Sequence, residues 1–392
     1  MVNFADIVVG LPERAYGIVN EAPSHLLLVG FLTSIVVILA SIWTFVFLLA
    51  PTPRAPYRSE RSYITTTPSG DATDPKPLPC WHDDWLAHRH EAATTTTEKH
   101  TGTIEGPEIM MSVIVPAYNE EERVEIMLEE AIAFLDKEYG RNPRPQNFAD
   151  GSIDGDKGKG MGGYEILIVN DGSSDKTIDV ALAFSRKNKL HDILRVCTLK
   201  ENRGKGGAVT HGFRHVRGQY AVFADADGAS KFEDLRELVK GCQEVEDGSS
   251  RGIAVGSRAH MVGTEAVVKR SALRNALMHS FHLLLRLLTP PATSRIRDTQ
   301  CGFKLFSRAA LPHIVPYMHV EGWIFDVEML MLAESAPSGN GDKGEGIKVA
   351  EVQIGWQEIG GSKLNVVWDS LAMAWGLAIL RASWMLGVYR RR

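Results

Sequence analysis

The sequence predicts an α/β protein with a parallel β-sheet, attached to a membrane by one N-terminal helix. Two observations lead to this fold class. Between residues 109 and 365, short β-branched runs alternate with helical patterns, which is typical of βαβ units packed as an α/β sandwich. Before them, residues 26–50 form a run of 25 positions without a charged side chain.

The uncharged run 26–50 is long enough to cross a bilayer. As a helix it would measure roughly 37 Å, against about 30 Å of hydrocarbon. A cleaved signal peptide would need a basic leader and a shorter apolar run, but Arg14 is the one Lys or Arg before it. Arg54, Arg58 and Arg61 follow the run. This bias places the rest of the chain in the cytosol and residues 1–25 in the lumen.

Composition narrows the class of protein further. The 392 residues include 43 Lys and Arg against 48 Asp and Glu, a net charge of −5, which argues against a nucleic-acid-binding protein. The four cysteines are far apart and form no CxxC pair, so neither a disulfide scaffold nor a zinc site is predicted. Scattered thiols fit a reducing compartment. They are Cys80, Cys197, Cys242 and Cys301.

Three segments lack the periodicity of helices or strands. Residues 51–108 are rich in Pro and Thr and are predicted to be a linker. Gly140–Gly163 and Ser335–Gly346 are rich in Gly and polar residues, which predicts mobile surface loops. The catalytic or binding domain is therefore expected at 109–365.

Within 109–365 the elements can be followed in order. Strands are predicted at 111–115, 164–169, 193–199, 220–224 and 252–255, and helices at 120–139, 177–189 and 208–216. The first strand should stop at Pro116, which cannot donate to a sheet. Ligands of such sheets bind beyond the carboxyl ends of the strands, and the unusual polar clusters of this chain lie there.

The first two strands end in polar motifs. Pro116–Glu120 (PAYNE) follows the first and could frame a nucleobase, although a plain turn explains it equally well. Asp171 follows the second strand directly, where a contact to a base or ribose is expected. Asp175 comes later, and we interpret it as a cap of the helix that begins near Thr177.

The third strand is followed by Lys200–Gly207 (KENRGKGG). Glycines with Arg203 and Lys205 at a helix start suit a phosphate, because backbone N–H groups and the helix dipole face it. A simple turn is the alternative. The loop is not a Walker A motif, because Gly206 and not Ser or Thr follows Lys205.

The fourth strand ends in Asp225-Ala-Asp227, the most informative motif of the chain. On an extended segment, residues i and i+2 point the same way. Two carboxylates side by side would repel each other, and a divalent cation would relieve the repulsion. Mg²⁺ and Mn²⁺ prefer carboxylate and phosphate oxygens. Asp225 and Asp227 are therefore predicted metal ligands.

These motifs, in this order and spacing, resemble those of family 2 nucleotide-sugar glycosyltransferases of GT-A fold. The resemblance covers about 110–363 and within the family is strongest to enzymes that transfer glucose from UDP-glucose to dolichyl phosphate at the endoplasmic reticulum. The narrower resemblance rests on Val255–Arg258, Ile296–Phe306, Glu321–Glu328 and Trp356–Lys363.

The resemblance implies roles for individual residues. Pro116, Tyr118, Glu120 and Asp171 would line the uridine pocket, with Lys205 at the diphosphate. Asp225 and Asp227 would hold Mg²⁺ or Mn²⁺. Arg258 and Arg270 would contact the acceptor phosphate. Trp323 and Asp326 would lie near the sugar; for Asp326 a structural hydrogen bond and a catalytic part remain alternatives.

The chemistry of such an acceptor agrees with this set of residues. A phosphate monoester is already anionic at neutral pH, with a second pKa of about 6. It can attack the anomeric carbon without a general base, so the enzyme mainly aligns it and neutralises the leaving diphosphate. A single in-line displacement would invert the sugar and give a β-linked product.

Two apolar segments are expected to meet the lipid bilayer. Residues 270–289 combine apolar residues at helical spacing with arginines, as in a helix on an anionic membrane surface; packing on the catalytic domain is the alternative. Residues 366–392 contain just 11 uncharged positions between Asp369 and Arg381, too few to span. Its tryptophans favour an interfacial helix, and homo-oligomer packing through it is open.

Two other functions remain as alternatives. One is transfer of mannose from GDP-mannose to dolichyl phosphate, because the segment 298–304 resembles the corresponding segment of mannosyl enzymes as well and does not separate the two. The Trp356–Lys363 segment and the N-terminal span favour glucose. The other is a non-catalytic membrane receptor for nucleotide sugars. Such a receptor would not need both the metal pair Asp225 and Asp227 and the acceptor residue Arg258.

Overall fold

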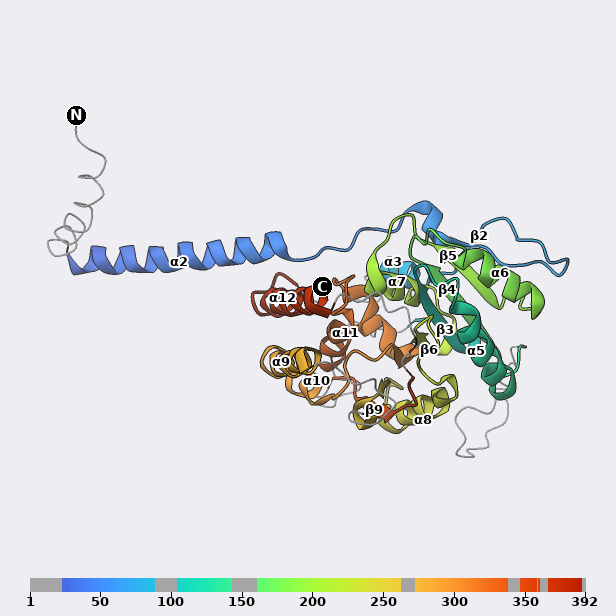
Figure 1. The fold of residues 1–392 in the computed structure, drawn as a ribbon. Helices are drawn as coiled ribbons and strands as arrows, with labels where there is room; N and C mark the ends of the chain where they lie inside the picture. Colours follow the sequence, from blue (N-terminus) through green and yellow to red (C-terminus); the bar gives the residue numbers. More distant parts are fainter. Residues whose placement is uncertain are drawn as a thin grey trace. The chain divides into compact units, whose positions relative to one another are not determined.

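The computed structural model describes residues 23–88, 104–142, 161–261, 272–337, 346–357, 359 and 366–389. Its centre is a seven-stranded sheet of order β5-β4-β3-β6-β8-β7-β9 (Figure 1). The strands are β3 (Ile109–Ala117), β4 (Tyr164–Asn170), β5 (Leu194–Thr198), β6 (Gly218–Ala224), β7 (Ile253–Ser257), β8 (Phe303–Ser307) and β9 (Val349–Gln353).

The sheet is mixed and not wholly parallel. Strands β5, β4, β3 and β6 are mutually parallel, as predicted, and β7 is parallel to β9. Strand β8 lies between β6 and β7 and is antiparallel to both. Its first residue, Phe303, therefore pairs with Ala224, the last residue of β6. The start of β8 thus lies at the edge where the parallel strands end.

Two sequence-based boundaries were wrong for identifiable reasons. Strand β3 does not stop at Pro116, which pairs in register with Val169 of β4. The ladder with β6 ends at Ile114, so Pro116 has a strand on one side alone, as at an edge. The third helix, α7, begins at Gly204 and not at Ala208; its first turn contains three glycines, which disfavour a helix and therefore indicated a loop.

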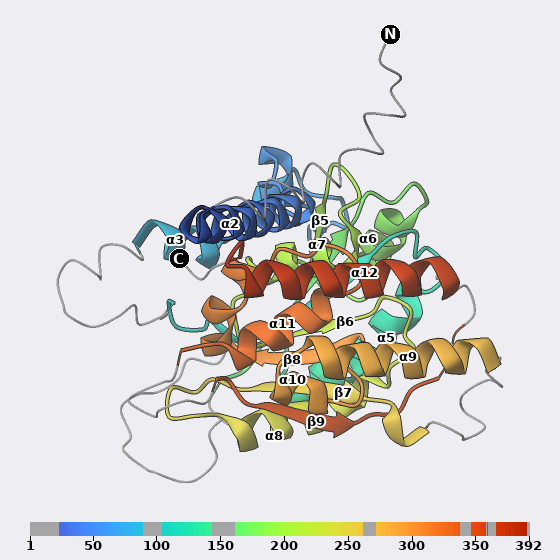
Figure 2. The same ribbon diagram turned by 90° about the vertical axis from the view of Figure 1, so that its left-hand side faces the viewer.

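The helices lie on both faces of the sheet. They are α5 (Val124–Glu138), α6 (Thr177–Lys187), α7 (Gly204–Phe213), α8 (Leu235–Val245), α9 (Ala272–Leu288), α10 (Pro291–Arg295), α11 (Phe325–Glu334) and α12 (Val366–Met385). Short 3-10 segments are η1 (Arg58–Arg61), η2 (Phe232–Asp234), η3 (Ala259–Met261), η4 (Arg308–His313) and η5 (Val315–Tyr317). Helix α10 contacts both α9 and α11 (Figure 2).

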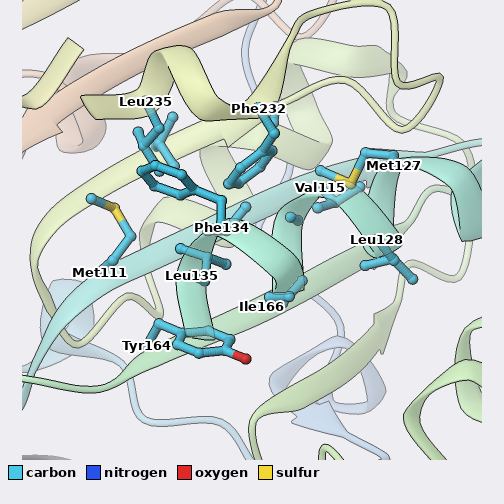
Figure 3. Close-up of a cluster of buried hydrophobic side chains, with 14 of the residues drawn as sticks. Met111, Val115, Met127, Leu128, Phe134, Leu135, Tyr164, Ile166, Phe232 and Leu235 are labelled. Atoms are coloured by element: carbon cyan, nitrogen blue, oxygen red, sulfur yellow. The ribbon is translucent and has the colours of Figure 1, made fainter. Parts of the chain in front are cut away.

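The hydrophobic core covers both faces of the sheet. On one face, alternate residues of β3 and β4, among them Met111 and Ile166, form one cluster with residues of α5 and α6, such as Phe134 of α5 (Figure 3). On the same cluster, α8 packs against β7, β8 and β9. On the other face, the Phe223 ring of β6 contacts Phe213 of α7 and Phe325 of α11. Burial on both sides explains why the strands are continuous apolar runs.

The described part of the expected linker, residues 51–88, is not a linker. We call it the strap. It contains β1 (Ser62–Tyr63), β2 (Lys76–Pro77) and α3 (Trp81–His88), and it belongs to the compact unit Pro51–Ala378. Ile64 pairs with Val196 of β5 through two backbone hydrogen bonds of 2.9 Å. The buried Trp81 donates its indole N–H to the carbonyl of Phe213 at 2.7 Å.

The N-terminal helix α2 spans Ser24–Leu49 and belongs to a separate unit. It matches the predicted span 26–50, and among the described residues it is the one helix long and apolar enough to cross a membrane. The predicted loops 140–163 and 335–346 lie mostly outside the described residues, as does Arg270.

Candidate active site

Three of the predicted site residues, Asp171, Asp225 and Asp227, lie at the edge where β3, β4 and β6 end. Asp171 follows β4 and donates its backbone N–H to the carbonyl of Ala117, the last residue of β3, at 2.8 Å. Asp225 and Asp227 follow β6. Since these three strands are parallel neighbours, their carboxyl ends meet, which is where ligands bind in such sheets.

Asp171 is a buried carboxylate between two loops. Its Oδ1 accepts the backbone N–H of Arg203 at 2.7 Å, and its carbonyl accepts the side-chain amide of Asn202 at 3.0 Å. Burial raises the pKa of Asp171 to about 6, although the N–H groups of Arg203 and Gly204 oppose the shift. The residue therefore joins the end of β4 to the glycine-rich loop before α7.

Asp225 lies against two neighbours that fix its side chain. Lys205 places Nζ 2.6 Å from Asp225 Oδ1. On the other side is Gly302, where any side chain would collide with the carboxylate of Asp225. The carbonyl of Gly302 also accepts the backbone N–H of Asp225 at 3.1 Å. The start of β8 thus supports Asp225 directly.

Asp227 adds a second negative charge beside Asp225. We expected an extended segment here, but the chain turns after Ala224. As a result, Oδ1 of Asp227 accepts the backbone N–H of Ala229 at 3.0 Å. Burial, and next the charge of Asp225, raise the pKa of Asp227. An excess of negative charge at this point is what a divalent cation would neutralise.

Asp326 is held in a buried ion pair. It lies at the start of α11, and its Oδ1 contacts Nζ of Lys304, which is fully buried in β8. Lys304 also donates to the carbonyl of Cys301 at 2.7 Å. Burial raises the pKa of Asp326, against the opposing charges of Lys304 and Lys205. These contacts are what a structural role of Asp326 would require. A catalytic role for Asp326 stays a prediction.

Arg258 follows β7 and forms a bidentate ion pair with Asp298. Its Nε and NH2 atoms donate to the two carboxylate oxygens of Asp298 at 2.7 and 2.9 Å. Its guanidinium also lies 5.5 Å from the Trp356 ring centre. Burial lowers the pKa of Arg258, but its bonds to Asp298 outweigh this and raise it. The fork of Arg258 is therefore charged and oriented.

The Pro116–Glu120 motif has local partners. The backbone N–H of Glu120 donates to Thr177 Oγ1 at 2.7 Å, and the carboxylate of Glu120 pairs with Arg123 at 2.6 Å. Tyr118 is exposed. Asp175 accepts the N–H of Thr177 at 3.0 Å, and helix α6 begins at Thr177. Asp175 therefore accepts a free N–H at the start of α6, as expected, although Lys176 and not Asp175 occupies the N-cap position.

The glycine-rich loop packs against the segment that contains Trp323. Arg203 pairs with Glu321, and the carbonyl of Glu321 accepts the N–H of Gly207 at 3.1 Å. A Cβ at Gly206 would lie 2.5 Å from Cβ of Phe325, so the glycines permit close packing. Trp323 is partly exposed and lines a mainly apolar pocket of about 340 Å³.

Three further residues contribute to the site, although no role was predicted for them from the sequence. Lys304 is a single charged residue in an apolar strand (FKLFS). Such a residue is rarely buried without an ion-pair partner, so the pattern indicates a buried ion pair. Asp298 and Gly302 lie in the Ile296–Phe306 segment, but nothing in their spacing shows that they contact Arg258 and Asp225. Those contacts depend on β8 running antiparallel.

Residues 112–314 match the model described as glycosyl transferase family 2, and the chain belongs to this family. The fold is accordingly that of a GT-A glycosyltransferase. More particular relatives are dolichyl-phosphate beta-glucosyltransferases. The one from Saccharomyces cerevisiae is 39% identical over 368 residues, 92% of this chain and 94% of its own length.

Two further relatives bear the same name. Those from Drosophila melanogaster and Homo sapiens are 40% and 38% identical over 310 residues, 77% of this chain and 86% of theirs. Among solved structures, the chain is similar to glucosyl-3-phosphoglycerate synthase from Mycobacterium tuberculosis in complex with Mn²⁺, UDP-glucose and phosphoglyceric acid. The TM-score is 0.44 at 18% identity, over 71% of this chain and 80% of that one.

Proposed function

We propose that this protein transfers glucose from UDP-glucose to dolichyl phosphate, with inversion, to form dolichyl β-D-glucosyl phosphate. The observation that carries the proposal is the identity of 39% to the yeast dolichyl-phosphate beta-glucosyltransferase over nearly the whole of both chains. The site supports it with two adjacent carboxylates, a lysine and an oriented arginine at one sheet edge. The product would be a donor for assembly of the N-glycan precursor.

The arrangement suits an acceptor that needs no general base. The phosphate of dolichyl phosphate is anionic at neutral pH, because its second pKa is about 6. Asp326, which would lie near the sugar, is held by Lys304 in a buried ion pair. The protein would therefore work by alignment: it would hold the acceptor phosphate in line behind the anomeric carbon.

Asp225 and Asp227 would hold Mg²⁺ or Mn²⁺. The donor set supports this, because Asp225 and Asp227 are two neighbouring carboxylates and hard cations prefer such oxygens. No cluster of three or more His, Cys, Asp or Glu side chains exists in the described part of the chain, so further ligands would be donor phosphate oxygens and water. When bound, the cation would neutralise charge on the departing diphosphate.

The other residues divide between donor and acceptor. Asp171, with Pro116, Tyr118 and Glu120, would line the uridine pocket, and Lys205 would face the diphosphate. Arg258 would bind the acceptor phosphate; its bonds to Asp298 set the plane of the fork in advance. Arg270 would be a second contact and Trp323 a neighbour of the sugar.

The membrane arrangement is also part of the proposal. Helix α2 would anchor the protein in the endoplasmic reticulum membrane, with the catalytic domain in the cytosol, as the arginines after the span indicate. Residues 366–392 would lie at the membrane interface. The apolar helix α2 supports the anchor, and the order of charges supports the orientation.

A labelling experiment tests the function. Purified protein would be incubated with dolichyl phosphate and, in separate reactions, radiolabelled UDP-glucose, UDP-galactose and GDP-mannose. We expect labelled lipid from UDP-glucose. Preferential labelling from GDP-mannose would support the mannosyl alternative, and nucleotide-sugar binding without any labelled lipid would support a receptor.

A further inference from the structure

The strap, residues 51–88, follows directly after the membrane helix and has been given no role so far. Its first turn reaches the loop Leu199–Gly204, which joins β5 to α7 and which we call the donor loop. The connection centres on Glu60, whose side chain is fully buried.

Glu60 accepts four hydrogen bonds on its two carboxylate oxygens. Oε1 accepts NH2 of Arg54 at 2.6 Å and the backbone N–H of Lys200 at 2.9 Å. Oε2 accepts NH1 of Arg54 at 2.8 Å and the backbone N–H of Tyr57 at 2.9 Å. One side chain therefore joins the strap to the first polar residue of the donor loop.

The main chain of Glu60 holds the elements on either side of that loop. Its carbonyl accepts Nε2–H of His211 in α7 at 2.8 Å and the thiol of Cys197 in β5 at 3.1 Å. Burial lowers the pKa of His211 to about 3, so its ring is neutral and its one N–H is committed to the strap.

The connection continues to the predicted uridine pocket. The carbonyl of Arg54 accepts NH2 of Arg203 at 3.3 Å, and the backbone N–H of Arg203 donates to Asp171 at 2.7 Å. The strap thus contacts the donor loop at both ends, at Lys200 through Glu60 and at Arg203 through Arg54. Between these contacts the loop is polar and partly exposed.

We infer that Glu60, with Arg54, is a positioning residue that holds the donor loop and Asp171 in the geometry that binds UDP-glucose. This inference rests on the proposed function. It makes the segment next to the membrane helix part of the donor site, although no atom of Glu60 touches the donor. Weakening the contact should therefore affect the donor and spare the acceptor.

Glu60→Gln is the informative substitution, because it preserves shape and removes one acceptor oxygen. Whichever way the amide lies, its NH2 group faces two N–H donors that the carboxylate satisfied. Asp83→Asn is the matched control. Asp83 is another acid of the strap. Burial would raise the pKa of Glu60 and of Asp83, but hydrogen bonds, with those to Arg54 and Arg214 first, lower both to about 2. The ion pairs of Asp83 are with Arg61, His82 and Arg214, not with the donor loop.

The experiment uses the full chain in lipid nanodiscs. For each variant we would measure the KM of UDP-glucose, the KM of dolichyl phosphate, kcat and the melting temperature. Because charge-assisted bonds are lost, Glu60→Gln should raise the KM of UDP-glucose by about tenfold or more. The KM of dolichyl phosphate should stay within about twofold, and Asp83→Asn should leave both near the wild-type values.

Arg54→Lys provides a second test should Glu60→Gln fold poorly. It keeps the charge and loses the fork, so a smaller rise in the KM of UDP-glucose is expected. Equal effects on both substrates, or a fall in melting temperature with both KM values unchanged, would overturn the inference. Calorimetric titration with UDP measures donor-site affinity without turnover. It therefore separates failure of the strap's role from failure of glucose transfer itself.

Discussion

Replacing Gly302 with alanine tests the position of Asp225. A Cβ at residue 302 would lie 2.6 Å from Asp225 Oδ1 and closer still to Oδ2, whereas ordinary van der Waals contact begins at 3.4 Å. Because the nearer oxygen, Oδ2, sets the movement needed, the carboxylate would have to move by more than about 1 Å. Since a misplacement of about 1 Å costs about 100-fold in rate, we expect kcat/KM for glucose transfer to fall by about 100-fold or more.

The assay for Gly302→Ala is initial-rate transfer of radiolabelled glucose to dolichyl phosphate, with a melting curve for each preparation. Gly302 is not among the residues with positive φ, so alanine can adopt its backbone conformation. Gly322→Ala is the control, because no heavy atom lies within 4 Å of a Cβ there. If Gly302→Ala is as active as the control, Asp225 does not need its observed position.

The remaining predictions concern the cation, the acceptor, the uridine pocket and the membrane orientation. Asp225→Asn or Asp227→Asn, and likewise EDTA, should lower turnover by about 100-fold or more; full activity in EDTA would remove the cation from the mechanism. Arg258→Ala should slow transfer by about 10- to 150-fold with UDP-glucose binding unchanged, and Arg258→Lys should recover part of the rate; parallel loss of transfer, donor binding and melting temperature would mean a structural role. Because the pKa of Asp171 is raised to about 6, its carboxyl takes up a proton as the pH falls below 6. The KM of UDP-glucose should therefore rise below pH 6, and Asp171→Asn should abolish this pH dependence. An unchanged pH profile in that variant would contradict the assignment. Protease added outside sealed microsomes should digest the catalytic domain, and its survival until detergent is added would reverse the orientation.

The sequence predicted the half of the sheet that is built from local signals. Strands β3 to β6 alternate with helices and end in polar motifs, so chain order alone placed Asp171, Asp225 and Asp227 at one edge. The rest depends on contacts between distant segments. Strand β8 was not among the predicted strands, and its antiparallel pairing with β6 is what brings Gly302 and Lys304 to the site.

The strap was missed for a different reason. Its Pro and Thr content is that of a linker, and its ordered structure comes from single contacts with β5 and α7, not from a periodic pattern. Glu60 is one acid among several in the sequence, and its partners Arg54 and Lys200 lie 6 and 140 residues away. Likewise, the pairing of Arg258 with Asp298 spans 40 residues. Such pairs become visible when the fold is known.

The position of Ile64 beside Val196 has a practical consequence for handling the protein without helix α2. Strand β5 is an edge of the large sheet, and the strap covers it by main-chain pairing. An uncovered edge strand has unpaired backbone N–H and C=O groups. A β-strand of another molecule can pair with them, which promotes aggregation. A shortened protein that starts at residue 109, where the sheet begins, would expose this edge together with the side of α7 that receives Trp81. One that starts at Pro51 keeps both covered, so solubility should be retained by cutting the chain just after α2.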